Sequence, residues 1–370
     1  MDHLLEVLKI VEGAMNADRT KVSAYVDQLA GKLEAEGEQK SAERLRRAAA
    51  GGRMAKMDVA EVALKRLPVD QESRLPLADE EQPRQGEVPL ILDTDAEKVV
   101  NEFLRSVNAS SRLLAQGIDF VPSLLAFGPP GCGKTQLARF LAAELHLPLI
   151  TARADSLISS FLGSTSKNLR TLFDHAVSRP CVLFLDEFDA VAKLRDDRYE
   201  LGELKRVVVS LLQNIDALSS QTVLVAATNH DHLLDPAIWR RFTYRVRMME
   251  PTERARVALF EEFLRGFATH ELVGDAAAIT EGFTGADIRQ VCEAAKREVV
   301  IAGQSAVDAA AVLSRILRIH RTKIAKPAST LASELKLARS INSDVFTYRR
   351  LAEMYDVSLG QISKLLKHDD

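Results

Sequence analysis

The sequence predicts an α/β fold: a parallel β-sheet with helices on both faces, followed by a helical lid subdomain and flanked by small all-helical N- and C-terminal segments. The 370 residues exceed what one hydrophobic core usually organises, so more than one domain is expected. Apolar residues make up 46% and charged residues 27% of the chain, as in ordinary globular proteins. From about residue 91 onward, short apolar runs alternate with helical patterns.

Residues 1–66 are predicted to form a helical N-terminal module, because they are rich in Ala, Leu, Glu, Lys and Arg. Apolar residues recur there at helical spacing, as in Leu4, Leu8, Val11, Met15, Val22, Val26, Leu29 and Leu33. Amphipathic character alone leaves two interpretations open, a docking or oligomerisation module and a packed extension. Residues 67–90 place four prolines among acidic side chains, a composition that resists helix and builds no core, so we predict a linker.

The next segment, residues 91–250, is predicted to form the large subdomain around the sheet. Alternation of strands with helices implies parallel pairing with helices on both faces. The expected strands are SLLAF (123–127), PLIT (148–151), CVLFL (181–185), TVLVAAT (222–228) and YRVRM (244–248). Strand signals cease after Pro251 and helical periods resume, so residues 251–325 are predicted to be the helical lid.

Charge and cysteine content limit the classes of partner and compartment. The net charge is -3, so no global positive field attracts nucleic acid or anionic lipid. The three cysteines are widely spaced and odd in number, which favours a reducing compartment. The N-terminus lacks the apolar region of a secretory signal, and no 18-residue apolar run occurs. We therefore expect a cytoplasmic protein that does not span a membrane.

A phosphate-binding loop is predicted between the strand at 123–127 and the helix that follows it. The sequence there fits G-x-x-x-x-G-K-[ST], with its members Gly128, Pro129, Pro130, Gly131, Cys132, Gly133, Lys134 and Thr135. Glycines let successive N–H groups point at phosphate oxygens, and the helix N-terminus adds partial positive charge. The expected sheet is therefore that of a P-loop NTPase. Cys132 is either a tolerated filler or a redox-sensitive thiol.

Catalytic and metal-binding groups are expected next to this loop. Lys134 is predicted to reach the β and γ phosphates, and the Thr135 hydroxyl to bind Mg²⁺. The strand at 181–185 delivers Asp186 and Glu187 at its carboxyl end, where open parallel sheets bind their ligands. Asp186 is predicted to serve the metal, and Glu187 to orient and deprotonate the attacking water.

With these two motifs, residues 91–325 resemble the AAA+ ATPases, and within them the branch that remodels or threads proteins, typified by FtsH, katanin and spastin. The resemblance implies ATP and Mg²⁺ as ligands and a homo-oligomeric ring, expected to be a hexamer. It also implies that Asn229, which follows the strand at 222–228, positions the water near the γ phosphate. The alternative for Asn229 is a turn cap.

Two further segments match the family's site. The segment LDPAIWRRF resembles the arginine-finger segment, which implies that Arg240 or Arg241, or both, enter the nucleotide site of a neighbouring subunit. The adjacent pair departs from the family pattern, so the choice between them stays open, as does a solvent-exposed role for both. The segment GFTGADIRQ resembles the lid signature, which implies that Gly285 and Ala286 lie beside the nucleotide base. Asp287 is expected to cap the helix that follows.

Phe161, Leu162 and Gly163 resemble the loop that lines the central pore in the family's protein-processing members. An aromatic side chain offers a large contact area at small entropic cost, which suits an extended polypeptide of any sequence. Core packing of Phe161 is the alternative. The charged stretch 196–200 is expected to form a second pore loop.

Residues 326–370 are predicted to form a helix-turn-helix-like tail, with Asp356 in the turn. The buried positions are expected to be Leu351, Ala352, Tyr355, Val357, Leu359, Ile362 and Leu365. From residue 343 the tail carries four basic and five acidic residues, a net charge of -1, which is poor for phosphate contact. We therefore favour a docking element, with base contact by Gln361, Ser363 and Lys364 as the alternative.

The predicted function is Mg²⁺-dependent ATP hydrolysis in a ring, coupled to remodelling, unfolding or threading of a protein substrate. One alternative is a nucleotide-switched, DNA-associated regulator that uses the C-terminal helices. Another is a motor subunit for a separate partner protease, because the chain has no HExxH motif and no convincing Ser or Cys nucleophile constellation.

Overall fold

The computed structural model describes residues 67–70, 74–152, 157, 162–192, 203–218, 222–323 and 330–367, together with residues 26, 29–33, 39, 41 and 42. The chain divides into two compact units, Met1–Arg66 and Leu67–Asp370. In the first unit, residues 29–33 are helical. Four of its described side chains are buried, Val26, Leu29, Ala30 and Ala42. Val26 and Leu29 belong to the apolar stripe that the sequence predicts.

The second unit begins with a six-stranded sheet of order β1-β3-β4-β5-β2-β6. Its strands are β1 (Ala78–Glu81), β2 (Ser123–Phe127), β3 (Leu149–Ala152), β4 (Cys181–Leu185), β5 (Thr222–Thr228) and β6 (Tyr244–Arg247). The five strands from β2 to β6 pair in parallel, as the sequence predicts. Parallel pairing brings the carboxyl ends of β2, β4 and β5 to one edge of the sheet.

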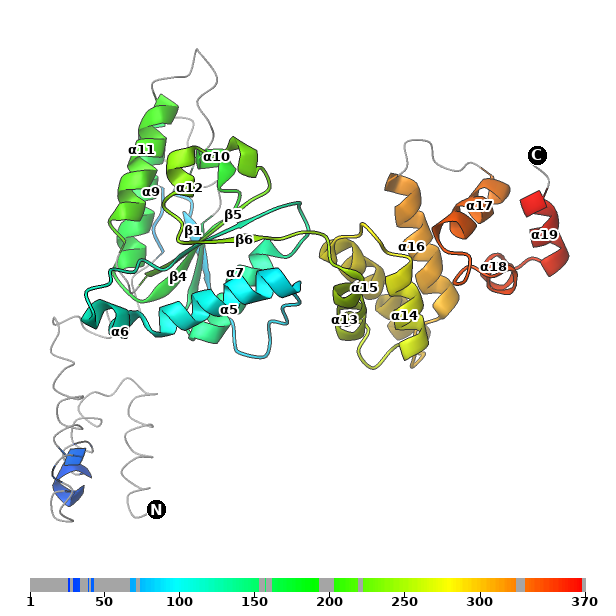
Figure 1. Cartoon of the computed structure of the whole chain (residues 1–370), viewed down its shortest axis with the longest axis horizontal. Coiled ribbons are helices and arrows are strands. Elements are labelled where there is room, and N and C mark those ends of the chain that lie inside the picture. Colours follow the sequence, from blue (N-terminus) through cyan, green and yellow to red (C-terminus); the bar gives the residue numbers. More distant parts are fainter. Residues whose placement is uncertain are drawn as a thin grey trace. The chain divides into compact units, whose positions relative to one another are not determined.

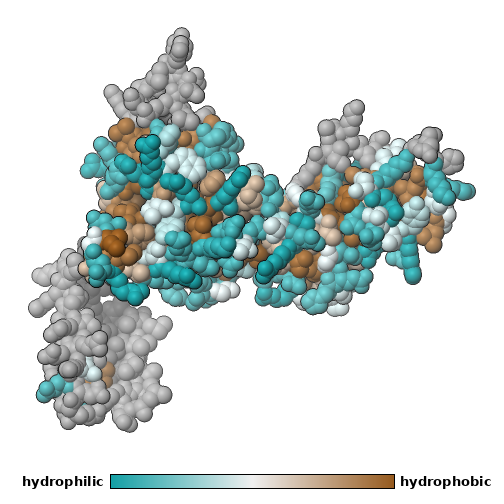
Figure 2. Space-filling model, in the orientation of Figure 1, coloured by the Kyte–Doolittle hydropathy of each residue, from teal (hydrophilic) through white to brown (hydrophobic). Residues whose placement is uncertain are grey.

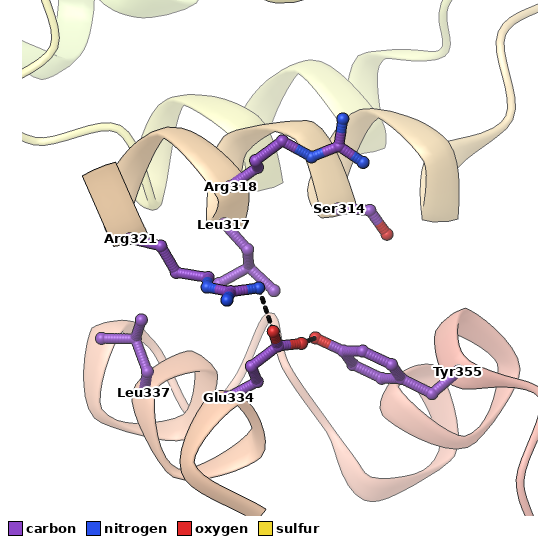
Figure 3. A pocket seen from close by; sticks show the side chains of 7 residues that line it. All are labelled: Ser314, Leu317, Arg318, Arg321, Glu334, Leu337 and Tyr355. Atoms are coloured by element: carbon purple, nitrogen blue, oxygen red, sulfur yellow. Dashed lines mark hydrogen bonds and ion pairs between the residues drawn. The ribbon is translucent and has the colours of Figure 1, made fainter. Parts of the chain in front are cut away.

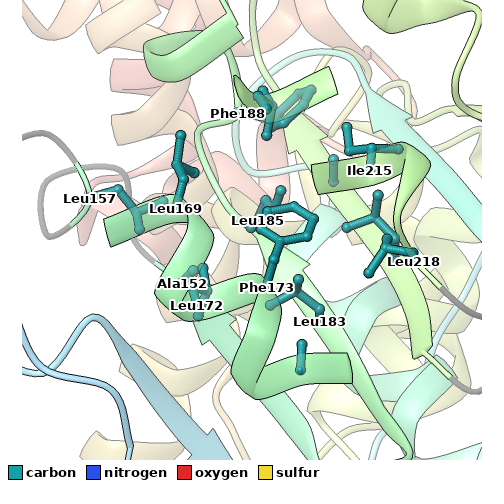
Figure 4. Close-up of a cluster of buried hydrophobic side chains, with 14 of the residues drawn as sticks. Ala152, Leu157, Leu169, Leu172, Phe173, Leu183, Leu185, Phe188, Ile215 and Leu218 are labelled. Carbon is teal, nitrogen blue, oxygen red and sulfur yellow. The ribbon is translucent and has the colours of Figure 1, made fainter. Parts of the chain in front are cut away.

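Helices cover both faces of this sheet (Figure 1). The helices of the large subdomain are α5 (Thr94–Asn108), α6 (Ser110–Ala115), α7 (Lys134–Leu145), α9 (Leu162–Val177), α10 (Asp189–Ala192), α11 (Glu203–Asp216), α12 (Pro236–Trp239) and the 3-10 helix η2 (Asp231–Leu233). Successive side chains of a strand point to opposite faces, so β4 sends Leu183 and Leu185 toward α9 and α11, and Val182 and Phe184 toward α5 and α7. Figure 4 shows the first of these two cores.

Strand β1 lies within residues 67–90, which the sequence predicts to be a linker. It pairs antiparallel with β3 at the edge of the sheet, so this part of the segment is structured. The Glu80 carboxylate accepts a 2.6 Å hydrogen bond from Arg179, just before β4. An edge strand tolerates charged side chains that a central strand would exclude. The strand is four residues long and mostly polar, so apolar alternation does not reveal it.

A second set of helices follows the sheet. They are α13 (Glu253–Phe263), α14 (His270–Ala278), α15 (Gly285–Ala302), α16 (Ala309–Lys323), α17 (Leu331–Ile341), α18 (Tyr348–Tyr355) and α19 (Leu359–Lys367). Threonine hydroxyls cap the first turns of five of these helices, since Thr252, Thr269, Thr284, Thr330 and Thr347 each accept a backbone N–H bond. Thr284 and Asp287 form a complete capping box, which confirms the capping role expected for Asp287.

The lid and the tail share one hydrophobic core, although the sequence suggests separate units at 251–325 and 326–370. Leu335, Phe346, Leu351 and Ile362 from the tail are fully buried among lid residues. Arg350 of the tail donates a 2.6 Å hydrogen bond to Asp275 of α14. Helices α17 to α19 are therefore an integral part of the lid.

The surface in Figure 2 is mainly hydrophilic on the face shown, with hydrophobic residues in small groups. Among the described residues, no helix is both long and apolar enough to cross a membrane.

Candidate active site

The predicted phosphate-binding loop connects β2 with α7, and left-handed glycines shape it. Gly128, Gly131 and Gly133 have φ of 139°, 78° and 90°, values that other residues rarely adopt. A Cβ on Gly128 would lie 2.0 Å from the Met248 carbonyl oxygen. The Gly128 N–H bonds to the carbonyl of Thr228, at the end of β5. The loop is thus attached to the neighbouring strand and has no room for a larger residue at its start.

Lys134 begins α7 and folds back over this loop. Its ammonium donates to the carbonyl oxygens of Gly128 and Pro129 at 2.8 and 2.7 Å. Burial lowers the pKa of Lys134, while the nearby charges of Cys132, Asp186 and Asp189 act in the opposite direction. The buried ammonium is thus held inside the curl of the loop, where phosphate oxygens could replace the two carbonyls as partners.

Cys132 lies in the same loop, and its Sγ is 3.9 Å from the carbonyl oxygen of Pro130. Burial raises the pKa of the Cys132 thiol, and the charge of Glu250 adds to this effect. Because the reactive form of cysteine is the thiolate, this environment favours the filler role over the redox-sensitive one.

The two predicted metal-binding residues meet at the mouth of the loop. The Thr135 hydroxyl donates a 3.2 Å hydrogen bond to Asp186 Oδ2. The other carboxylate oxygen of Asp186 accepts the backbone N–H of Glu187 at 2.9 Å. A hydroxyl and a carboxylate oxygen from different elements are hard oxygen ligands of the kind that Mg²⁺ prefers. The donor set therefore fits this ion.

Glu187 and Asn229 follow the carboxyl ends of two adjacent strands, β4 and β5. Glu187 is exposed, and its φ of 48° is a left-handed value that is uncommon for a residue other than glycine. The Asn229 Oδ1 atom is buried and has no hydrogen-bond partner. A buried acceptor without a partner is costly, so this oxygen is suited to receive a hydrogen bond from a ligand or water.

The lid signature contacts the phosphate-binding loop directly. The Ala286 N–H donates a 3.0 Å hydrogen bond to the Gly131 carbonyl, and a Cβ on Gly131 would lie 2.8 Å from the Thr284 hydroxyl. Gly285 also lies close to the loop, because a Cβ built on Gly285 would be 3.5 Å from the Gly131 carbonyl oxygen. Gly285 and Ala286 therefore lie next to the loop, and contact with the base stays a prediction.

A cavity of about 680 Å³ opens between residues 89–91 and the lid helices α13 and α14. The Pro89 carbonyl accepts a hydrogen bond from Gln136, two residues after Lys134, which fixes this wall to the helix of the phosphate-binding loop. Pro89 and Leu90 fall in the segment that the sequence predicts to be a linker, and Ile91 is the first residue of the predicted large subdomain, so no sequence signal marks this side of the cavity. Pro89, Leu90 and Ile91 line one side of this cavity, although the prolines of the preceding segment suggest a linker.

The two candidate finger arginines have different environments. Arg241 forms an ion pair with Asp216 of α11, with contacts of 2.6 and 2.9 Å. Arg240 is exposed and has no ion pair within the part of the chain that the structure describes. Nothing in the local sequence around Asp216 points to a pairing with Arg241.

The segment around these arginines packs on the α9 and α11 side of the sheet through Leu234, Ile238 and Phe242. Helix α7 covers the other side. No described contact joins Arg240 to the phosphate-binding loop of its own chain.

The predicted pore residues lie largely outside the described part of the structure. Phe161 is not among the described residues, and neither are residues 196–200. Leu162 and Gly163 are the first two residues of α9. The pore-loop role of all three residues stays a prediction.

Of the three residues named above for base contact, Gln361 is already engaged. The Gln361 side-chain oxygen accepts hydrogen bonds from the Ser358 N–H and hydroxyl, so this amide caps α19. Arg349 pairs with Glu353. Asp356 has the left-handed conformation expected of the turn, with φ of 52°.

Of the tail positions expected to be buried, Leu351 and Ile362 are buried, and four are partly buried against the same core: Ala352, Tyr355, Val357 and Leu365. The expectation for Leu359 is wrong, because this residue is 54% exposed. It is the first residue of α19, whose buried residue is Ile362.

A polar network joins the tail to α16 (Figure 3). Glu334 of α17 pairs with Arg321 of α16 and accepts a 3.1 Å hydrogen bond from the Tyr355 hydroxyl of α18. Burial and the adjacent Glu334 carboxylate raise the pKa of Tyr355 to about 12. A cavity of about 130 Å³ lies beside this network. Among the described residues, no group of three or more His, Cys, Asp or Glu could hold a metal ion by itself.

Comparison with known proteins supports the family resemblance. A profile described as "ATPase family associated with various cellular activities (AAA)" matches residues 124–249. The chain is similar to "Uncharacterized AAA family ATPase y4kL" of Sinorhizobium fredii, with 39% identity over 224 residues, which cover 60% of this chain and 67% of that protein.

Two other relatives have lower identity to the chain. The "Cell division cycle protein 48 homolog" of Archaeoglobus fulgidus is 33% identical over 241 residues, covering 62% of this chain and 32% of that protein. The "Ribosome biogenesis ATPase RIX7" of Saccharomyces cerevisiae is 30% identical over 257 residues, covering 66% of this chain and 29% of that protein. The chain thus spans about a third of the length of these two relatives.

Proposed function

The chain belongs to the AAA family of ATPases and hydrolyses ATP, and from this premise we propose that it works as a homo-oligomeric ring, expected to be a hexamer, that remodels, unfolds or threads a protein substrate. The family supports the ring, since AAA ATPases commonly form one. Similarity to a cell division cycle protein 48 homolog supports action on a protein.

The proposed chemistry is assigned to residues at the mouth of the phosphate-binding loop. Lys134 leaves the carbonyls of Gly128 and Pro129 to bind the β and γ phosphates, and the loop N–H groups hold the remaining oxygens. Thr135 and Asp186 hold Mg²⁺, which when bound neutralises charge on the phosphates. Such an arrangement serves mainly to position the reacting groups and stabilise charge.

Water activation is assigned to Glu187 and Asn229. The exposed Glu187 carboxylate accepts a proton from the attacking water. The unpartnered Asn229 Oδ1 accepts the other O–H of the same water and so fixes its direction of approach. We accordingly expect Glu187→Gln to bind ATP without hydrolysing it.

The observation that supports a ring most directly is the difference between Arg240 and Arg241. Arg241 is held within its own chain by Asp216, whereas the exposed Arg240 guanidinium makes no ion pair among the described residues. A guanidinium that reaches a transferred phosphoryl group stabilises its charge and is worth about 10³ to 10⁵ in kcat. We assign this role to Arg240, acting on the nucleotide of a neighbouring subunit.

Mixed oligomers test this assignment. Arg240→Ala and Glu187→Gln should each be inactive alone, because one lacks the finger and the other the base. Mixing them should restore part of the turnover, since an intact finger can then face an intact water site. Arg241→Ala serves as the matched control and should lose less activity than Arg240→Ala. A failure of mixing to restore any turnover, with both proteins assembled, would reject hydrolysis between subunits.

Protein substrates are assigned to the loop formed by Phe161, Leu162 and Gly163. Phe161→Ala should leave ATP turnover largely intact and remove substrate handling, because the aromatic side chain supplies most of the contact area. A suitable measurement is ATP-dependent crosslinking of labelled, unfolded casein to Glu187→Gln, compared with the variant that also carries Phe161→Ala. Equal crosslinking by the two proteins would contradict the pore assignment.

The DNA-associated alternative has less structural support, because Gln361 is engaged in capping and Arg350 binds the lid. Lys364 and Lys367 are the basic side chains of α19, the helix that also carries Gln361. Truncation at residue 326 would disrupt the lid core, so charge reversal of these two lysines is the appropriate test. If the wild type binds duplex DNA at low salt and the reversed variant does not, the alternative is supported.

A motor role for a separate partner protease is compatible with the same ring. Residues 1–66 are then the proposed docking module for the partner or the cargo. Proteins retained by Glu187→Gln with ATP, compared with and without residues 1–66, would identify which of the two this module binds.

A further inference from the structure

Thr228, the last residue of β5, joins three parts of the site. Its carbonyl oxygen accepts the N–H of Gly128 at 3.3 Å, which connects it to the phosphate-binding loop. Its hydroxyl donates a short, 2.6 Å hydrogen bond to Asp189 Oδ1 and accepts the N–H of His230 at 3.0 Å. The side chain is 1% exposed. A buried hydroxyl whose donor and acceptor capacity are both used has a fixed orientation.

Asp189 is two residues beyond Glu187 in the same turn. The turn is closed by a 2.9 Å hydrogen bond from the Ala190 N–H to the Glu187 carbonyl, and Asp189 is the first residue of α10. On the other strand, Asn229 directly follows Thr228. The Thr228–Asp189 hydrogen bond therefore links the turn that carries Glu187 to the strand end that carries Asn229.

A main-chain hydrogen bond also joins the turn after β4 to the end of β5, from the Phe188 N–H to the Ala227 carbonyl at 2.8 Å. It fixes the separation of the two backbones. The side-chain bond adds a second point of attachment beyond the strand ends, where the two candidate water-binding groups stand. Together, the Thr228–Asp189 and Phe188–Ala227 hydrogen bonds restrict rotation of the turn that carries Glu187 relative to β5. One of these bonds alone would not restrict it.

We propose that Asp189 is a positioning residue for ATP hydrolysis, which acts through the Thr228 hydroxyl to hold Glu187 and Asn229 at the spacing that one attacking water requires. It touches neither water nor phosphate in this role. The proposal rests on the functions proposed above for Glu187 and Asn229. It predicts an effect on the chemical step, because small displacements of groups that orient a reactant cost large factors in rate.

The test compares two threonines of the same strand. Thr228→Val removes the hydroxyl at the end of β5 that faces the site. Thr222→Val is the matched control, because Thr222 begins β5, is equally buried and donates its hydroxyl to the Ala176 carbonyl at 3.2 Å. We expect kcat to fall about tenfold or more in Thr228→Val, with KM and the Kd of a non-hydrolysable ATP analogue within about twofold of wild type. Thr222→Val should keep the wild-type kcat.

Two further variants separate positioning from general destabilisation. Thr228→Ser retains the hydroxyl and should recover most of the lost turnover. Asp189→Ala removes the other partner and should lower kcat to a similar degree, and the double variant with Thr228→Val should be no worse than either single one. If Thr228→Val does not fold, Asp189→Ala alone tests the proposal, which again requires a lower kcat with an unchanged Kd for the ATP analogue.

A kcat within about twofold of wild type in Thr228→Val or Asp189→Ala would overturn the proposal, as would a loss of analogue binding with unchanged kcat. Glu187→Gln, measured in parallel, separates this failure from failure of the proposed function. An active Glu187→Gln enzyme rejects the assigned water site itself. An inactive one, together with an unaffected Thr228→Val, rejects only the positioning role.

Discussion

Phe346 offers a direct test of the finding that the C-terminal helices belong to the lid. Its ring is fully buried in the core that α13 to α16 share with α17 to α19. Replacing a buried Phe by Ala costs about 3–5 kcal/mol, from lost transfer energy and the cavity left behind. For a unit the size of the lid with its tail, 1 kcal/mol corresponds to about 4 °C in Tm. We therefore expect Phe346→Ala to lower the melting midpoint of the lid by about 12–20 °C.

The assay is thermal unfolding followed by far-ultraviolet circular dichroism. Leu359→Ala is the control, since this leucine lies in the same tail but is 54% exposed, and it should change stability by less than about 0.5 kcal/mol. A midpoint for Phe346→Ala within about 2 °C of wild type would refute the shared core. So would a separate melting transition of the tail in the wild-type protein.

Three further predictions concern other parts of the chain. Lys134→Ala should weaken ATP binding by about tenfold or more, as measured by titration with a fluorescent analogue, because it removes a charged partner of the phosphates. Gly128→Ala should destabilise the large subdomain in thermal melts, because its Cβ would lie 2.0 Å from the Met248 carbonyl oxygen. The pKa of Tyr355 is about 12 in the folded state against about 10 when unfolded. The protonated phenol therefore contributes stability that is fully present below pH ~10 and is lost as pH rises toward ~12. Wild-type protein should accordingly lose more stability over this range than Tyr355→Phe, and equal losses in urea unfolding would contradict the role of the hydrogen bond to Glu334.

Several predictions from the sequence are confirmed because they depend on short-range patterns. Apolar runs separated by helical periods predict the five parallel strands, since the alternation itself reflects a sheet buried on both faces. The spacing of Gly128, Lys134 and Thr135 requires only that a strand precede the loop and a helix follow it. The capping role of Asp287 needs only the three residues before it.

Other features depend on residues distant in sequence. Strand β1 forms because it pairs with β3 and because Arg179 binds Glu80. Both β3 and Arg179 lie outside residues 67–90, so the sequence of that segment does not reveal these interactions. The exposed position of Leu359 likewise follows from which face of α19 packs on the lid. Helical spacing identifies an apolar stripe but not its limits.

The sequence by itself determined the strand–loop–helix arrangement of the predicted phosphate-binding loop and the layered sheet, because motif spacing and hydrophobic periodicity are local properties of the chain. Only the tertiary structure decided which of the adjacent arginines is held by Asp216 and which makes no ion pair among the described residues, and only it joined Thr228 to Asp189 and the tail to the lid. Each of these depends on an encounter between segments that are far apart along the chain, and such encounters are set by how the whole core packs rather than by neighbouring residues.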